Sequence, residues 1–240
     1  GGRELSLGAP RSRPEAGAYV SPHGILVNRK VEGIEHKSSK AAVDQLIDKL
    51  DNELGCMLVS SYEFPGRYAR WTVGFTSPAV QIEGKGLEFS VKALNARGSA
   101  MVAIIESHLE NQPELFQVSS APAGGAQSQP YEDLLTLTGR VVASDRYFPE
   151  EERSKQPSLF SLVRAVRELF GSPQGRTESQ RDPESPPAPP RVLHSEDEQL
   201  GMYGAFGYDL TFQFEPVEHK KARPQGQRDL VLFIPDEVCF

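Results

Sequence analysis

Hydrophobic positions recur with a helical period in residues 38–55, SSKAAVDQLIDKLDNELG. Apolar side chains at three- and four-residue steps would form one stripe on an amphipathic helix: Val43, Leu46, Ile47, Leu50 and Leu54. Ser38 or Ser39 can cap the start of this helix, and Gly55 can take the left-handed conformation at its end.

A second helical stripe follows Pro157. Its apolar positions are Leu159, Leu162, Val163, Val166 and either Leu169 or Phe170. The three glutamates 150–152 precede this helix. They could be read as acid–base carboxylates, but acidic side chains also suit the positive end of a helix dipole, and we interpret them as a helix start.

Other segments have the alternation or the short apolar runs of strands. Predicted strands lie in GILVNRK, CMLVSS, YARWTVGF, LEFSVKAL and RDLVLFIPDEVCF, with CMLVSS and the last of these buried. SAMVAIIESHLE combines a strand-like start with a helical end, SSAPAGGAQSQP is expected to be a loop, and YEDLLTLTGRVV is ambiguous and could be a strand pair. Strand clusters with separated helices predict an α+β architecture.

Composition divides the chain into four parts. Residues 1–18 are rich in Gly, Pro and Arg and are expected to be a disordered leader. Residues 19–170 form the first part of an ordered domain, 171–199 a disordered Pro-rich insertion, and 200–240 the second part of that domain. Both ends look cut, so we expect a fragment of a longer protein.

Charge and residue counts exclude several functions. The net charge is -7 and the pI is about 5.4, which is not the basic footprint of a nucleic-acid-binding protein. No apolar run reaches the roughly 20 residues of a membrane span. The two cysteines lie far apart and none of the five histidines has metal-ligand spacing, so we expect no disulfide framework and no metal site.

Two stretches carry candidate binding chemistry. SSYEFPGRYARW, residues 60–71, combines hydroxyls, aromatic rings and two arginines around a Pro-Gly turn. Its hydroxyls can bind a small polar ligand and its guanidinium groups a carboxylate, although strand–turn–strand packing would use the same residues. GMYGAFGYDL, residues 201–210, has glycines that allow close approach of a backbone or a ligand.

Four separated blocks together resemble the N-terminal region of anthranilate synthase component I, most closely the form fused to a glutamine amidotransferase. The blocks are GCMLVSSYEFPGRYARWTVGF, FPEEERSKQPSLFSLVRAVRELF, GMYGAFGYDLTFQFEPVEHK and RDLVLFIPDE. The resemblance implies part of that family's α/β sandwich, incomplete in this chain. It implies a lyase that converts chorismate and glutamine, or ammonia, to anthranilate and pyruvate in L-tryptophan biosynthesis.

In this family the catalytic groups and the Mg²⁺ ligands lie in the C-terminal chorismate-binding half, so the resemblance implies no catalytic residue here and an inactive fragment. It implies instead part of the site for tryptophan, the feedback inhibitor. LVSSYE matches the family's Leu-Glu-Ser-like element: Ser61 falls on the family serine and Ser60 replaces the usual acidic residue. Arg67 and Tyr68 match the following Arg-Tyr pair, and Gly204 and Tyr208 belong to a block that packs near this region.

Alternatives remain open at this stage. Aminodeoxychorismate synthase and the isochorismate or salicylate synthases share the fold, and a truncated chain could be a non-catalytic module that binds tryptophan or a partner. The expected partners are tryptophan, chorismate through the missing half, and an amidotransferase that is fused or separate. The expected compartment is the cytoplasm, or a plastid if the leader is the end of a transit peptide.

Overall fold

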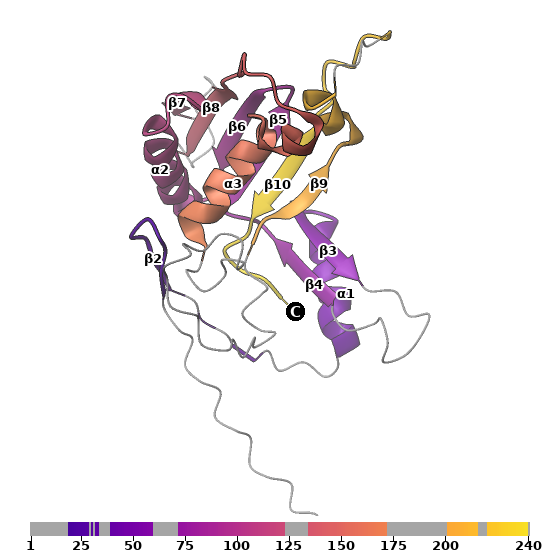
Figure 1. Cartoon of the computed structure of the whole chain (residues 1–240). Coiled ribbons are helices and arrows are strands. Elements are labelled where there is room, and N and C mark those ends of the chain that lie inside the picture. Colours follow the sequence, from indigo (N-terminus) through magenta and orange to yellow (C-terminus); the bar gives the residue numbers. More distant parts are fainter. Residues whose placement is uncertain are drawn as a thin grey trace, which may run out of the picture. The chain divides into compact units, whose positions relative to one another are not determined.

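The computed structural model describes residues 19–28, 30, 32–33, 39–59, 72–122, 134–171, 201–215 and 220–239 (Figure 1). The chain divides into two compact units. One comprises Gly1–Glu35 and Glu168–Ser185, and the other comprises His36–Arg167 and Pro186–Phe240. The four-part division expected from composition stays a prediction, because its leader and most of its insertion lie outside the described residues.

The smaller unit contains a short hairpin. Strand β1 (Tyr19–Val20) pairs antiparallel with β2 (Leu26–Val27), and Gly24 between them has φ +80°. The buried Ser21 hydroxyl accepts hydrogen bonds from the backbone N–H groups of His23 and Ile25. Strand β2 of this hairpin confirms the strand predicted in GILVNRK.

A six-stranded antiparallel sheet forms the larger unit, in the order β7-β8-β6-β5-β10-β9. The strands are β5 (Val80–Lys85), β6 (Glu88–Ala93), β7 (Phe116–Pro122), β8 (Leu135–Val141), β9 (Tyr203–Phe206) and β10 (Leu230–Ile234). Strand β10, near the end of the chain, lies between β5 and β9, so segments far apart in sequence meet in the sheet.

One face of this sheet is the hydrophobic core. Side chains at alternate positions of the four central strands, β8, β6, β5 and β10, are buried there, among them Ile82, Val91, Leu137 and Leu232. Helices α2 (Ala96–Glu110) and α3 (Leu159–Phe170) cover this face in Figure 1. Each buried aliphatic side chain stabilises the fold by about 1.5–3 kcal/mol relative to its exposed state.

The opposite face of the sheet is polar along β5 and β6. Glu83 of β5 binds Lys92 of β6 at 3.0 Å and also pairs with Arg228. Such alternation of buried apolar and outward polar positions is typical of an antiparallel sheet with one solvated face. With its two helices on the other face, the unit confirms the predicted α+β class.

A two-stranded ribbon precedes the sheet. Strand β3 (Gly55–Val59) pairs antiparallel with β4 (Thr72–Thr76), and the backbone of Gly74 in β4 also exchanges hydrogen bonds of 2.9 and 2.8 Å with Cys239. Helix α1 (Ser39–Leu50) packs on the ribbon, since a Cβ atom at Gly74 would lie 2.3 Å from a methyl group of Leu46. Both cysteines are free thiols.

Helical segments follow the sequence prediction with one correction, at Gly55. The helix after Pro157 buries Leu169 at 2% exposure and leaves Phe170 half-buried, so Leu169 completes the stripe. Gly55 does not end a helix: it begins β3, where a Cβ atom would lie 2.3 Å from the carbonyl oxygen of Phe75. The glycine is needed for close strand approach. Glutamates 150–152 do open a helix, a short 3₁₀ turn at Glu150–Lys155 before α3.

The strand predictions need three further corrections. SAMVAIIESHLE is helical throughout, because Asn95 caps α2 by accepting a hydrogen bond from Gly98 N at 2.8 Å. The first residues of the expected loop SSAPAGGAQSQP belong to β7, and YEDLLTLTGRVV contains the single strand β8. Strand β3 is not buried as expected, since Leu58 and Val59 at its end are 53% and 57% exposed.

Candidate functional site

The residues with the strongest sequence signal lie outside the described part of the chain. Ser60, Ser61, Arg67 and Tyr68 fall within residues 60–71, between β3 and β4. Gly204 and Tyr208, the residues expected to support that site from a neighbouring block, are described. The structure therefore describes the two strands on either side of residues 60–71.

Residues 60–71 connect the end of β3 to the start of β4. Val59, the last residue of β3, pairs directly with Thr72, the first residue of β4. Directly opposed residues of an antiparallel pair have Cα atoms about 4.5–5.5 Å apart. The chain thus leaves the ribbon after Val59 and re-enters it at the directly opposed Thr72, and the expected Pro-Gly turn between them lies outside the described residues.

Aromatic contacts connect this ribbon to the edge of the main sheet. The ring of Phe75 in β4 lies 5.5 Å from the ring of Tyr203 in β9 and 6.1 Å from that of Phe233 in β10. Phe75 is only 2% exposed. Burial raises the pKa of the Tyr203 phenol. The glycine- and aromatic-rich block at 201–210 thereby packs against the strand that follows residues 60–71.

Gly204 and Tyr208 have different surroundings within this block. Gly204 has φ +156°, and a Cβ atom there would lie 2.0 Å from the carbonyl oxygen of Val231 in β10. Its role in the described structure is close strand pairing. Tyr208 begins the 3₁₀ helix η5 (Tyr208–Gln213) and is 82% exposed, with its ring packed edge-on against Phe212 at 6.3 Å.

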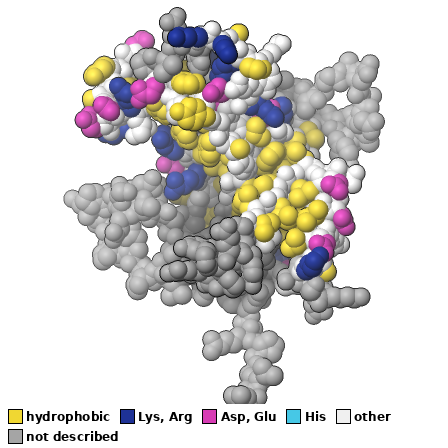
Figure 2. Space-filling view, turned by 90° about the vertical axis from the view of Figure 1, so that its right-hand side faces the viewer, with side chains coloured by type: hydrophobic (Ala, Val, Ile, Leu, Met, Phe, Trp, Pro, Cys, Tyr) yellow, Lys and Arg dark blue, Asp and Glu magenta, His cyan; other side chains and the backbone are white. Residues whose placement is uncertain are grey.

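Strands β3 and β9 carry large exposed apolar side chains. The large ones on β3 and β9 are Leu58, Val59 and Phe206, at 53%, 57% and 52% exposure. Figure 2 looks at the side of the molecule that carries β3 and β9 in Figure 1, and hydrophobic side chains gather on it. Apolar clusters of this kind often accompany interaction surfaces.

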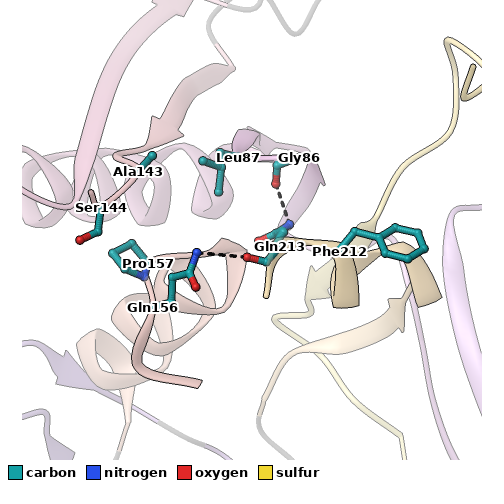
Figure 3. A pocket seen from close by; sticks show the side chains of 8 residues that line it. All are labelled: Gly86, Leu87, Ala143, Ser144, Gln156, Pro157, Phe212 and Gln213. Atoms are coloured by element: carbon teal, nitrogen blue, oxygen red, sulfur yellow. Dashed lines mark hydrogen bonds between the residues drawn. The ribbon is translucent and has the colours of Figure 1, made fainter. Parts of the chain in front are cut away.

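A pocket of about 310 Å³, which sequence reasoning missed, lies at the turn between β5 and β6 (Figure 3). Its apolar walls include Leu87 from that turn, Ala143 from the segment after β8, and Pro157 from the start of α3. Glutamines 156 and 213 and Ser144 supply polar groups. These residues come from four separate segments and share no motif, so only the fold brings them together.

A chain of hydrogen bonds holds the pocket wall in place. Gln156 Nε2 donates to the Gln213 carbonyl oxygen at 3.3 Å, and Gln213 Nε2 donates to the Gly86 carbonyl oxygen at 2.7 Å (Figure 3). Gln213 Oε1 accepts from the backbone N–H of Leu159 at 2.9 Å and so caps α3. Gly86 N in turn donates to the carboxylate of Asp229 at 2.7 Å.

Asp229 is a buried charge, 1% exposed, and it is paired with Arg223. Hydrogen bonding to Asp229 raises the pKa of the Arg223 guanidinium. Arg223 Nε lies 3.1 Å from Asp209 Oδ2 but lacks hydrogen-bond geometry, so this second contact is an ion pair only. The cluster fixes the segment before β10 to the β5–β6 turn.

The described residues hold no group of three His, Cys, Asp or Glu side chains that could bind a metal ion. Within the same residues no helix is long and apolar enough to cross a membrane.

Comparison with known proteins gives one informative match. No protein-family model matches the chain. Over 215 residues it is 36% identical to a protein of Azospirillum brasilense named anthranilate synthase. The match covers 90% of this chain and 24% of that relative, so the chain spans about a quarter of the relative's length. These findings place the chain among the relatives of anthranilate synthase and confirm the resemblance that its four sequence blocks predict.

Proposed function

We propose that this chain is the N-terminal regulatory part of an anthranilate synthase and contributes to a site for the feedback inhibitor tryptophan. The observation that carries the proposal is the 36% identity over 90% of the chain. The match of LVSSYE to the family's inhibitor element supports the regulatory role. Val59 and Thr72, which flank residues 60–71, pair directly with each other, so this segment is attached to the ribbon at both of its ends.

The residue types in this segment suit an amino acid with an aromatic side chain. The hydroxyls of Ser60 and Ser61 can hydrogen-bond the ammonium and carboxylate of tryptophan, and Arg67 can pair with the carboxylate. Tyr68 provides an aromatic face for the indole ring. Ser60 stands where the family has an acidic residue, so the ammonium loses a charged partner and we expect weaker inhibition than in the family.

Feedback inhibition at this site would operate by thermodynamic linkage. Tryptophan must bind a low-activity state more tightly than the active state, and chorismate must prefer the active state. Ribbon β3–β4 is a candidate route for this coupling, because Phe75 connects it to β9 and β10 of the main sheet.

The catalytic steps belong, in this proposal, to the parts of the enzyme that this chain does not include. Those parts would bind chorismate and Mg²⁺, and a fused or separate amidotransferase would supply ammonia from glutamine. The product would be anthranilate, with release of pyruvate.

The test is a calorimetric titration of L-tryptophan into this chain extended through a chorismate-binding half. The same titration is made with Ser61→Ala and with Ser120→Ala, an exposed hydroxyl deletion on β7. We expect Ser61→Ala to weaken binding by at least about tenfold, as for the loss of one hydrogen bond to a charged group, and Ser120→Ala to leave it unchanged.

Product analysis on the same extended protein separates the alternatives. Formation of anthranilate from chorismate and ammonia supports the proposal, whereas an aminodeoxychorismate product assigns the chain to the related synthases. Tryptophan binding without turnover indicates a non-catalytic module. If the extended protein forms anthranilate but does not bind tryptophan, the regulatory part of the proposal fails and the enzyme assignment stands.

A further inference from the structure

We propose that the pocket at the β5–β6 turn is a second ligand site, which binds a small uncharged molecule with one apolar ring and an amide or alcohol group. This pocket is built by residues 86–87, 143–144, 156–157 and 212–213, none of which belongs to the segment assigned to tryptophan. The inference therefore does not depend on the proposed regulatory site.

The size of the pocket sets the size of the ligand. Its volume of about 310 Å³ lies at the lower end of the range of about 300–1,000 Å³ that is typical of small-molecule sites. A hollow of this size fits a molecule built on a single ring.

The chemistry of the walls sets the charge of the ligand. No Asp, Glu, Lys, Arg or His lines the pocket. A charged ligand would lose part of its hydration there without gaining an ionic partner, which is unfavourable. Tryptophan and chorismate both carry charged groups, so neither suits this pocket. Leu87, Ala143 and Pro157 offer an apolar surface to an uncharged ring (Figure 3).

Two polar groups of the lining residues keep free hydrogen-bonding capacity. Gln156 uses its Nε2 group to bind the Gln213 carbonyl oxygen, but its Oε1 atom accepts no hydrogen bond from the described residues. The Ser144 hydroxyl accepts from the backbone N–H of Arg146 at 3.2 Å, and no described acceptor takes its proton. One acceptor and one donor are the complement of an amide or an alcohol.

The hydrogen-bond chain makes these walls rigid before any ligand binds. Gln213 is held at both ends of its amide, by Gly86 and by Leu159, and Gly86 is held in turn by the buried Asp229. In a pre-formed site, little of the binding free energy is lost to the ordering of side chains. Even a small probe should therefore bind measurably.

The test uses benzamide and its charged isostere benzoate as probes of the whole chain by NMR. We expect benzamide to shift the side-chain amide signals of Gln156 and Gln213 in a saturable way, and benzoate to bind at least about tenfold more weakly. Ala143→Trp places a large ring in the pocket from an exposed position and should weaken benzamide binding at least about tenfold.

A matched variant, Ser120→Trp, introduces the same ring at an exposed position on β7 and should leave benzamide binding unchanged. Absence of saturable shifts with benzamide overturns the proposal. Equal binding of benzoate, or unchanged binding in Ala143→Trp, also overturns it. None of these results bears on tryptophan binding at residues 60–71, so the two proposals fail separately.

Discussion

The ring of Phe75 lies 5.5 Å from the ring of Tyr203, tilted by 54°. Phe75 belongs to β4, directly after the segment assigned to tryptophan, and Tyr203 begins β9 at the edge of the main sheet. The contact joins the two sequence blocks with the most distinctive residue patterns. The strand that follows residues 60–71 is thus joined to the edge of the main sheet through the buried ring of Phe75.

Phe75→Ala should lower the free energy of unfolding by about 3–5 kcal/mol, because it removes a buried ring and leaves a cavity between Tyr203 and Phe233. Urea denaturation followed by circular dichroism measures this change. Tyr208→Ala is the matched control, since that ring is 82% exposed and its loss should cost less than about 0.5 kcal/mol. Equal effects of the two substitutions would show that Phe75 does not join β4 to the sheet.

Gly204→Ala should separate β9 from β10. The added Cβ atom would lie 2.0 Å from the Val231 carbonyl oxygen, and the backbone at φ +156° is unfavourable for alanine. We expect a loss of about 2 kcal/mol or more and faster amide hydrogen exchange along β9. Gly226→Ala, where nothing lies within 4 Å of the new atom, should change stability by less than about 0.5 kcal/mol. Slow exchange along β9 in the Gly204 variant would contradict this account.

The sequence predicted those elements whose hydrophobic pattern is local and strong. The stripe Leu159, Leu162 and Val166 gave α3, and the apolar run at the end of the chain gave β10. The pattern failed where residue type and periodicity disagree. Val102, Ile104 and Ile105 are β-branched and resemble a strand, but the Asn95 cap and the spacing of Val102, Ile105 and Leu109 make α2 a helix.

Sheet order and the β5–β6 pocket could not be predicted from local patterns. Strand β10 enters between β5 and β9 from the far end of the chain, and no short-range signal sets that register. Gly86, Ser144, Gln156 and Gln213 are common residues at unremarkable spacings. For residues 60–71 the situation is reversed. Their motif is recognisable in the sequence, but they lie outside the described structure.

Asp229→Ala should destabilise the fold by about 3–5 kcal/mol, since it leaves the Arg223 charge and the Gly86 N–H without their buried partner. Asp229→Asn keeps an oxygen acceptor and should cost less, about 1–3 kcal/mol. Arg97→Ala removes an ion pair to Asp236 whose arginine side chain is 69% exposed, and it should cost at most about 1 kcal/mol. Thermal unfolding of the three variants gives the order, and a smaller effect for Asp229→Ala than for Arg97→Ala would rule out the buried pair as an anchor.

Glu83 should make stability depend on pH in the acid range. Partial burial raises the pKa of its carboxyl group, but hydrogen bonds and charges from Lys92 and Arg228 outweigh this effect and hold the pKa below its ordinary value. The ionised form is thus favoured in the folded state. Its contribution is complete above the unfolded pKa of about 4.3 and is lost as the pH falls through the lower folded value.

Glu83→Gln should therefore lower the urea midpoint at pH 7, by the equivalent of at most about 1 kcal/mol because the pair is partly solvated, and the difference from the parent chain should shrink below about pH 4. Glu114→Gln is the matched control, since this exposed carboxylate has no ion pair among the described residues, and it should change the urea midpoint at pH 7 very little. A Glu83→Gln difference that grows toward pH 3 would show that Lys92 and Arg228 do not stabilise the ionised carboxylate.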